Sequence, residues 1–196
     1  MYGIYESGQV IARFVAPMGV KSNVPVFASD TLSLSRPTSA RTAQRWEIET
    51  RLEPLSFNAQ DLFVNLVVNG YTGVVQVLMP QNYGAIQARG TTSGGTGSGG
   101  VDATTITISG MSGLMPKGTF VRFSNHNKVY MTTSDRSGNG SVGIFPALRT
   151  SISGTAMDNG DDVLGNFRYD FDTVTGMSFT DGVLQDVGIV KLVEDV

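Results

Sequence analysis

Apolar and polar residues alternate most regularly between residues 46 and 52. The apolar face of this segment carries Trp46, Ile48, Thr50 and Leu52. The opposite face carries Glu47, Glu49 and Arg51. A period of two residues is typical of a β-strand that has one buried and one solvated face. We therefore expect a half-buried strand here, with its charged face in solvent.

Shorter segments before and after this strand also favour extended structure. Residues 9–14 predict a short strand that ends at Pro17 and Gly19. Residues 24–27 favour another strand, but Pro25 has no backbone N–H to donate and therefore suits an edge strand or a turn better than a central strand. Residues 74–79 are almost continuously apolar, as in a buried strand, and residues 85–89 are its expected partner.

Two further strands are expected near the C-terminus. Residues 163–171 alternate and have an aromatic face, and residues 188–193 are mainly apolar. Few partners are available to these strands unless they pair with residues 46–52 and 74–79. The pattern therefore predicts a discontinuous host domain, built from residues 1–90 and 163–196.

A single helix is expected at residues 58–69. Its apolar positions follow helical spacing and are Ala59, Leu62, Phe63, Leu66 and Val67. Asn58 is suited to cap the start, and Gly70 is suited to end the helix. The chain otherwise consists of short alternating segments and 24 glycines, which favours a mainly β class.

Residues 91–162 predict a second, inserted module. Residues 104–109, 120–124, 128–133 and 141–145 are strand-like, which indicates a compact barrel of roughly five strands. Residues 90–100 are almost entirely Gly, Ser and Thr, a composition typical of a flexible linker. We therefore expect a flexible entry joint before the barrel, and a turn at residues 157–162 after it.

Composition restricts the classes of function. The formal net charge is −3, from 14 basic and 17 acidic residues, whereas general nucleic-acid binders are usually basic. The chain has no cysteine, so disulfides and thiolate metal sites are excluded. Residues 1–13 do not have the pattern of a signal peptide, and no apolar run reaches the length of a membrane span.

No residue of the sequence is assigned a catalytic or metal-binding role. His126 is the single histidine, and we interpret it as a surface residue in a turn between strands. Residues 135–140 resemble the start of a calcium loop, but Pro146 stands where the last acidic ligand is required. A cluster of acidic residues could bind a cation but is more typical of a solvated turn: Asp158, Asp161 and Asp162. We expect no enzyme activity and no cofactor.

Small barrels of the oligonucleotide/oligosaccharide-binding (OB) type use aromatic side chains to bind ligands. The candidates for such a platform are Phe120, Phe123, Tyr130 and Phe145. Aromatic residues on the strands of a small barrel are more often core residues. Scattered basic residues are also present in the insert: Lys117, Arg122, Lys128, Arg136 and Arg149.

Three segments together resemble the distal tail (Dit) proteins of long-tailed bacteriophages, in the subgroup with an inserted OB-fold domain. Residues 77–81 and 86–90 are similar to the strand pair that ends the first half of the host domain. Residues 118–131, which include His-Asn-Lys-Val-Tyr, are similar to the strand–loop–strand of the insert. Residues 141–148 resemble the segment that follows it.

The resemblance implies a β-sandwich host domain with one helix and an OB-like barrel on its outside. It also implies a hexameric ring at the distal end of the virion tail, joined to the tail tube and to tip or baseplate proteins. Fibres or receptor-binding proteins are further implied partners, and no active-site residue is implied. The alternatives are a carbohydrate-binding module that contacts the host surface and a single-strand nucleic-acid binder.

Overall fold

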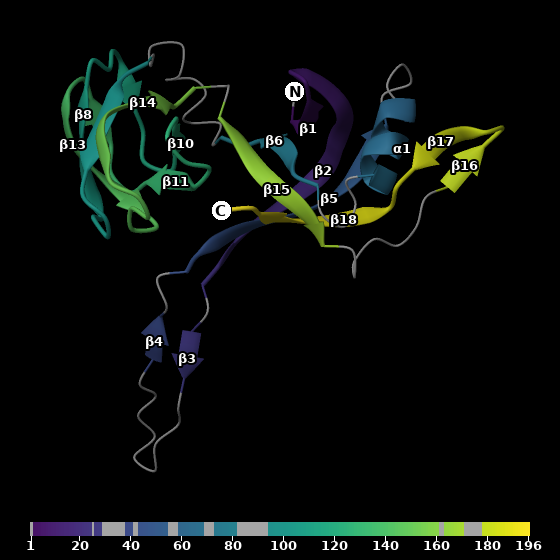
Figure 1. The fold of residues 1–196 in the computed structure, drawn as a ribbon, viewed down its shortest axis with the longest axis horizontal. Helices are drawn as coiled ribbons and strands as arrows, with labels where there is room; N and C mark the ends of the chain where they lie inside the picture. Colours follow the sequence, from purple (N-terminus) through teal and green to yellow (C-terminus); the bar gives the residue numbers. More distant parts are fainter. Residues whose placement is uncertain are drawn as a thin grey trace.

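The computed structural model describes residues 2–24, 26–28, 38–40, 43–54, 59–68, 73–81, 94–160, 163–170 and 178–196. In this part of the chain the fold is mainly β, with one helix and two closed six-stranded barrels (Figure 1). The expected class, a β domain with one helix and a small inserted barrel, is confirmed. The boundary expected at residue 90 and the strand expected at residues 85–89 lie outside the described residues.

The first barrel, called the host barrel here, takes strands from both ends of the chain. Its order is β1 (Gly3–Glu6), β2 (Gln9–Asn23), β5 (Arg45–Pro54), β18 (Ile189–Glu194), β15 (Leu164–Asp170) and β6 (Val75–Leu78), which closes on β1. All of these pairs are antiparallel. Strand β18 pairs with β5, placing Leu192 opposite Ile48, and β15 pairs with β6. The predicted pairing of the C-terminal strands is therefore confirmed, and the strands of the expected sandwich close into a barrel.

Strand β2 is much longer than predicted. It does not end at Pro17 but continues to Asn23, because a bulge accommodates the proline. Val15 lies opposite Arg51 and Gly19 lies opposite Glu49, so three residues of β2 face a single residue of β5. Beyond this strand, β3 (Val26–Ala28) and β4 (Thr38–Ala40) form a hairpin that extends away from both barrels (Figure 1).

Helix α1 (Ala59–Val68) occupies the predicted position, but it buries fewer apolar residues than predicted. Ala59, Leu62 and Leu66 pack into the host core, whereas Phe63 and Val67 are exposed. The helix contacts β2 and β17 (Val183–Asp186), which forms a hairpin with β16 (Ser178–Thr180). Among the described residues, no helix is long and apolar enough to cross a membrane.

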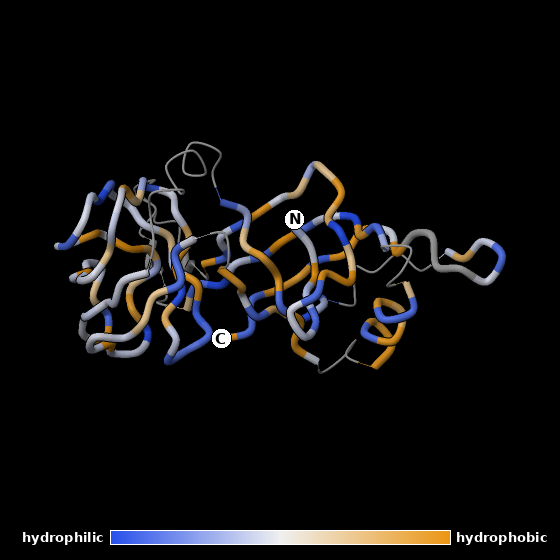
Figure 2. Tube along the Cα trace, turned by 90° about the horizontal axis from the view of Figure 1, so that it is seen from above, coloured by the Kyte–Doolittle hydropathy of each residue, from blue (hydrophilic) through white to orange (hydrophobic). Residues whose placement is uncertain are grey.

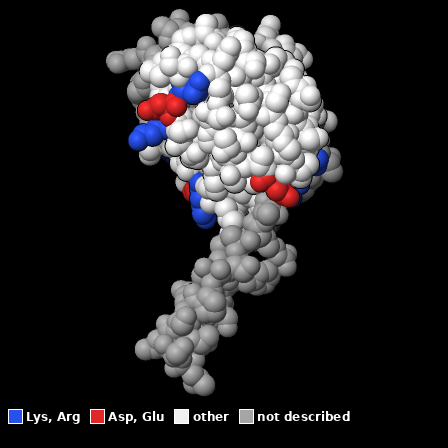
Figure 3. All heavy atoms as spheres, turned by 90° about the vertical axis from the view of Figure 1, so that its left-hand side faces the viewer, with Lys and Arg blue, Asp and Glu red and all other residues white. Residues whose placement is uncertain are grey.

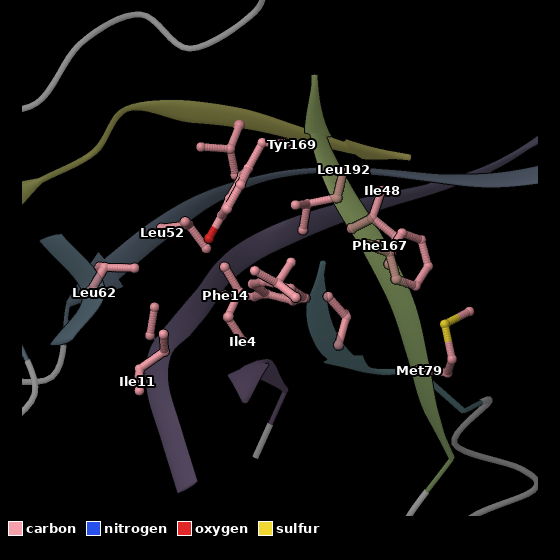
Figure 4. Packing of buried hydrophobic residues seen from close by; sticks show 14 of the residues in the cluster. Ile4, Ile11, Phe14, Ile48, Leu52, Leu62, Met79, Phe167, Tyr169 and Leu192 are labelled. Carbon is pink, nitrogen blue, oxygen red and sulfur yellow. The ribbon is translucent and has the colours of Figure 1, made fainter. Parts of the chain in front are cut away.

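The host core lies inside the barrel, as Figure 4 shows. Strands β1, β2, β5, β15 and β18 all direct apolar side chains into it, among them Ile4, Phe14, Ile48, Phe167 and Leu192. Burying each of these side chains contributes about 1.5–3 kcal/mol. Figure 2 colours the chain by hydropathy and shows that hydrophobic and hydrophilic positions are interspersed along the strands.

The second barrel, called the insert barrel here, has six strands where roughly five were expected. Its order is β10 (Phe120–Phe123), β11 (Val129–Thr132), β13 (Gly140–Phe145), β8 (Thr105–Ser109), β7 (Thr96–Gly99) and β14 (Ile152–Asp158), which closes on β10. The short strands β9 (Leu114–Met115) and β12 (Arg136–Ser137) pair beside it. Strand β14 was missed, and its last two residues lie where a turn was expected.

The prediction that residues 90–100 form a linker is wrong for β7, which pairs with both β8 and β14. The glycines of β7 serve packing rather than flexibility. A Cβ on Gly97 would lie 2.5 Å from Phe123 Cε1 and 3.0 Å from Ile152 Cδ1. Only glycine lets this strand approach the core so closely.

Candidate functional site: the barrel junction and two exposed surfaces

The carboxylate of Glu194 joins the two barrels. Glu194 ends β18 of the host barrel, and its side chain is fully buried. Its Oε1 accepts a hydrogen bond of 2.8 Å from the backbone N–H of Val129 in the insert barrel. Its Oε2 accepts one of 3.0 Å from the backbone N–H of Trp46 in the host barrel, and another from the Lys128 ammonium. One side chain therefore holds three elements in a fixed arrangement.

Lys128 completes this buried network from the insert side. Its ammonium forms an ion pair with Glu194 and donates a 2.6 Å hydrogen bond to Gln44 Oε1. The amide of Gln44 donates in turn to Ser22 Oγ, at 3.1 Å. Burial lowers the pKa of Lys128 from 10.5 to about 8, although the Glu194 carboxylate opposes this shift. The network is therefore paired and hydrogen-bonded, as buried charges require.

Aromatic contacts surround the network. The ring of Trp46 meets Phe120 edge-on, with centroids 5.1 Å apart, and meets Phe145 at 6.2 Å. Its indole N–H donates a 2.9 Å hydrogen bond to the carbonyl of Val129. The side-chain amide of Gln81 forms two hydrogen bonds with the backbone of Phe120, as a neighbouring strand would. Its oxygen accepts a 2.7 Å bond from the Phe120 N–H, and its nitrogen donates a 2.9 Å bond to the Phe120 carbonyl.

These contacts join one side of the insert barrel to the host core, while the rest of the insert has a core of its own. Phe120 and Val129 belong to the same buried apolar cluster as the host strands, and Met131 and Phe145 pack against it. Arg122 adds a 2.8 Å hydrogen bond to the carbonyl of Leu164. The insert is therefore held against the host barrel by buried contacts, whereas the sequence predicts only a flexible entry joint before it. The composition of residues 90–100 could not predict the junction, because the residues that form it, such as Trp46, Lys128 and Glu194, lie elsewhere in the chain.

The aromatic residues considered as a ligand platform are core residues. Phe120, Phe123 and Tyr130 are buried, and the half-buried Phe145 packs against the host core. The basic residues of the insert are not gathered on one site either, since Lys128 lies in the junction and Arg122 pairs with Asp158 at 3.1 Å. Figure 3 shows that the face of the insert end carries few charges, and that these are of both signs.

His126 has a larger structural role than the predicted surface turn. Its ring is half-buried and stacks on Phe123, with centroids 6.0 Å apart. Nε2 lies 2.8 Å from the hydroxyl of Tyr130, and Nδ1 lies 2.7 Å from Asn125 Oδ1. Burial and the nearby Arg149 lower its pKa. Both ring nitrogens are thus engaged in local structure.

The described acidic residues that were considered as cation ligands already have partners in the protein. Asp135 accepts a 2.7 Å hydrogen bond from the backbone N–H of Lys117, which anchors the turn, and Asp158 pairs with Arg122. Asp161 and Asp162 lie outside the described residues. Within the part of the chain that the structure describes, no group of three or more His, Cys, Asp or Glu side chains could hold a metal ion.

An exposed apolar patch is formed by residues of α1 and β16. Its members are Phe63, Val64, Val67, Val68 and Phe179, which are between 38% and 67% exposed. Phe63 and Phe179 contact each other edge-on, with centroids 5.6 Å apart. The sequence pattern did not reveal this patch, because the helical spacing of apolar residues does not show which of them face the core.

The bulge of β2 forms a hollow on the outer surface of the host barrel, called the bulge pocket here. Its volume is about 410 Å³, and its main lining residues are Val15, Pro17, Met18, Arg51 and Ile189. The buried hydroxyl of Thr50 lies 3.2 Å from the carbonyl of Val15, which supports one side of the bulge. The pocket was missed because the pattern appeared to end the strand at Pro17.

No protein-family model and no curated protein sequence matches the chain.

Proposed function

We propose that this chain is a structural subunit of the tail tip of a long-tailed bacteriophage, with the role of a Dit protein. In this proposal six copies assemble into a ring at the distal end of the tail. The ring connects the tail tube above it to the tip or baseplate proteins below it. The proposal combines a resemblance with one structural observation, the exposed apolar patch. The resemblance lies in residues 77–81, 86–90, 118–131 and 141–148.

The patch supports self-assembly because its five members are contiguous along one helix and one adjacent strand. A contiguous exposed apolar surface is typical of a protein–protein interface, whereas scattered apolar residues are not. Much of the charge on the described part of the host barrel is already paired, as in Arg13–Glu53 and Arg168–Asp195. An apolar contact surface is typical of the subunits of a permanent assembly.

The insert barrel fits the role of a fixed outward attachment. The buried ion pair and the aromatic contacts of the junction prevent it from rotating against the host barrel. In a ring, six insert barrels would then occupy six defined positions. Such positions suit the anchoring of fibres or receptor-binding proteins, which must point in set directions.

The proposal assigns no catalytic residue and no cofactor, and no membrane insertion. A carbohydrate-binding or single-strand-binding insert is less well supported, because the four candidate aromatic side chains pack in the cores. A stacking platform for sugars or bases requires exposed ring faces.

Light scattering over a range of concentrations tests the proposal. We expect a particle of six times the 20.9 kDa chain mass. A mass equal to one chain at all concentrations would contradict self-assembly, and a stable dimer would contradict the hexameric ring.

A further inference from the structure

We propose that a polar pocket on the host barrel binds one neutral sugar residue. The pocket has a volume of about 410 Å³ and is lined by parts of β1, β6, β15 and helix α1. Its polar lining comes from Glu6, Ser7, Asn65, Gln76 and Asn166. The pocket is separate from the insert barrel and from the apolar patch, and its role does not depend on the formation of a ring.

One wall of the pocket is a row of side chains across three neighbouring strands. Tyr5 of β1 lies opposite Gln76 of β6, and Gln76 lies opposite Asn166 of β15. Residues that lie directly opposite each other project from the same face of a sheet. Gln76 is flanked by Val75 and Val77, which are buried in the host core, so this face is the outer one. The row therefore places an aromatic ring and two amide groups side by side on the outside of the barrel.

Two amide atoms of this pocket lack the hydrogen bonds that buried polar groups normally make. The Oδ1 of Asn166 is buried and has no hydrogen-bond partner among the described residues. Asn65 is only 3% exposed, and its Oδ1 accepts a 3.2 Å hydrogen bond from the Tyr169 hydroxyl. Its Nδ2 donates to no acceptor in the described part of the chain. Because native proteins rarely leave buried polar groups unpaired, these two atoms point to a ligand that both donates and accepts hydrogen bonds.

A sugar matches this arrangement because each of its hydroxyl groups is both a donor and an acceptor. Asn65 supplies a donor, Asn166 supplies an acceptor, and the Gln76 amide supplies both. The carboxylate of Glu6 is a further acceptor, and Tyr5 adds apolar surface for the C–H groups of a sugar ring. A volume of about 410 Å³ is at the small end of ligand pockets, which suits a single sugar residue.

The lining disfavours charged ligands. No lysine or arginine is among the described residues that line the pocket, so a phosphate or another anion would find no counter-charge. Glu6 is the one carboxylate among these residues, whereas Ca²⁺ takes about six to eight oxygen ligands. A neutral ligand with many hydroxyl groups is therefore favoured.

Saturation-transfer difference NMR on the full chain tests this inference, because the method detects weak binding to large particles as well as to monomers. The probes are glucose, galactose, mannose, N-acetylglucosamine and N-acetylgalactosamine at millimolar concentration. We expect difference signals from the ring protons of at least one of these sugars. No signal from any of them on the folded protein would overturn the inference.

Asn166→Ala removes the unpartnered carbonyl and should weaken sugar binding about fivefold, as expected for one lost hydrogen bond. The melting temperature should not fall, because this Oδ1 has no partner to lose among the described residues. Gln76→Ala should weaken binding to a similar extent, and its exposed position protects the fold from the change. The matched control is Gln60→Ala, which removes an exposed amide of α1 outside the pocket and should leave binding unchanged.

The variants also show where a bound sugar lies. Equal signals from the wild type, Asn166→Ala and Gln76→Ala would place the sugar elsewhere and overturn the inference. A melting temperature that is raised by Ca²⁺ but by none of the sugars would show a cation site, and would overturn it as well. Neither result alters the proposed ring, because light scattering measures assembly independently of sugar binding.

Discussion

Lys128 of the insert barrel and Glu194 of the host barrel form an ion pair in which both side chains are buried. Glu194 also accepts hydrogen bonds from the backbones of Trp46 and Val129, one from each barrel. The start of β11 in the insert and the C-terminal strand β18 are far apart in the sequence. The ion pair and these hydrogen bonds fix them to each other. The two barrels are predicted to behave as one folding unit.

Replacing Glu194 should strongly destabilise the protein. Glu194→Gln keeps the shape of the side chain but leaves the Lys128 charge buried without a counter-charge. Removing one partner of a buried pair costs about 3–5 kcal/mol. Urea unfolding should therefore show that the free energy of unfolding falls by about 3–5 kcal/mol.

Asp195→Asn is the matched control for that variant, because Asp195 is the next residue and forms a more exposed pair with Arg168. Exposed pairs contribute about 0–1 kcal/mol, so its effect should be small. The double variant Lys128→Met with Glu194→Gln should recover part of the loss. Equal effects of Glu194→Gln and Asp195→Asn would contradict a structural role for the junction.

Trp46 is the only tryptophan of the chain and lies in the junction, where it is buried. Its fluorescence therefore reports on contact between the barrels. In the wild type we expect little quenching by acrylamide, and a fluorescence unfolding curve that coincides with the far-ultraviolet circular dichroism curve. A fluorescence transition that precedes the loss of β-structure would show that the barrels separate before they unfold.

The pKa of Lys128 predicts a dependence of stability on pH. Burial lowers this pKa to about 8 in the folded state, from 10.5, so the unfolded state binds more protons between these values. The contribution of Lys128 to stability should therefore rise with pH from about 8 upwards, by at most about 1.4 kcal/mol per pH unit. Below pH 8 it should be constant.

The difference in unfolding free energy between the wild type and Lys128→Met, measured from pH 7 to 10, isolates this contribution. A difference that stays flat across the range would show that Lys128 keeps its ordinary pKa in the fold.

Gly97→Ala should destabilise the insert barrel. Its new methyl group would collide with Phe123 and Ile152, and overpacking of a core costs about 1–3 kcal/mol. Gly100→Ala is the control, because nothing lies within 4 Å of a Cβ at that position. Thermal unfolding should separate the two variants, whereas a flexible linker at residues 96–99 would tolerate both equally.

The strands of the host were predictable where one face is clearly apolar. Residues 46–52 and 188–193 carry this signal, and their pairing follows because few other strands are available as partners. A β host with one helix and an inserted barrel could therefore be predicted, but not that the host strands close into a barrel. Strand β7 of the insert could not, because Gly97 and Gly99 give a strand no apolar pattern.

Neither the buried junction nor the exposed patch could be predicted from the sequence, because both depend on contacts between distant segments. From the local sequence, charged residues such as Lys128 and Glu194 are expected to be exposed to solvent. They form a buried pair only because the fold brings together two segments that are far apart in the sequence. Phe63 and Leu62 are adjacent in one amphipathic helix, yet one is exposed and the other is buried. Which apolar side chains remain outside depends on how the helix is rotated on the barrel, and spacing alone does not determine this.

Negative-stain images of the purified chain are the sharpest test of the proposed ring. Class averages should show rings with six-fold rotational symmetry and six peripheral lobes, one for each insert barrel. Because the junction is rigid, these lobes should be as sharp as the ring itself. Single two-lobed particles at all concentrations, or rings of another symmetry, would contradict the account.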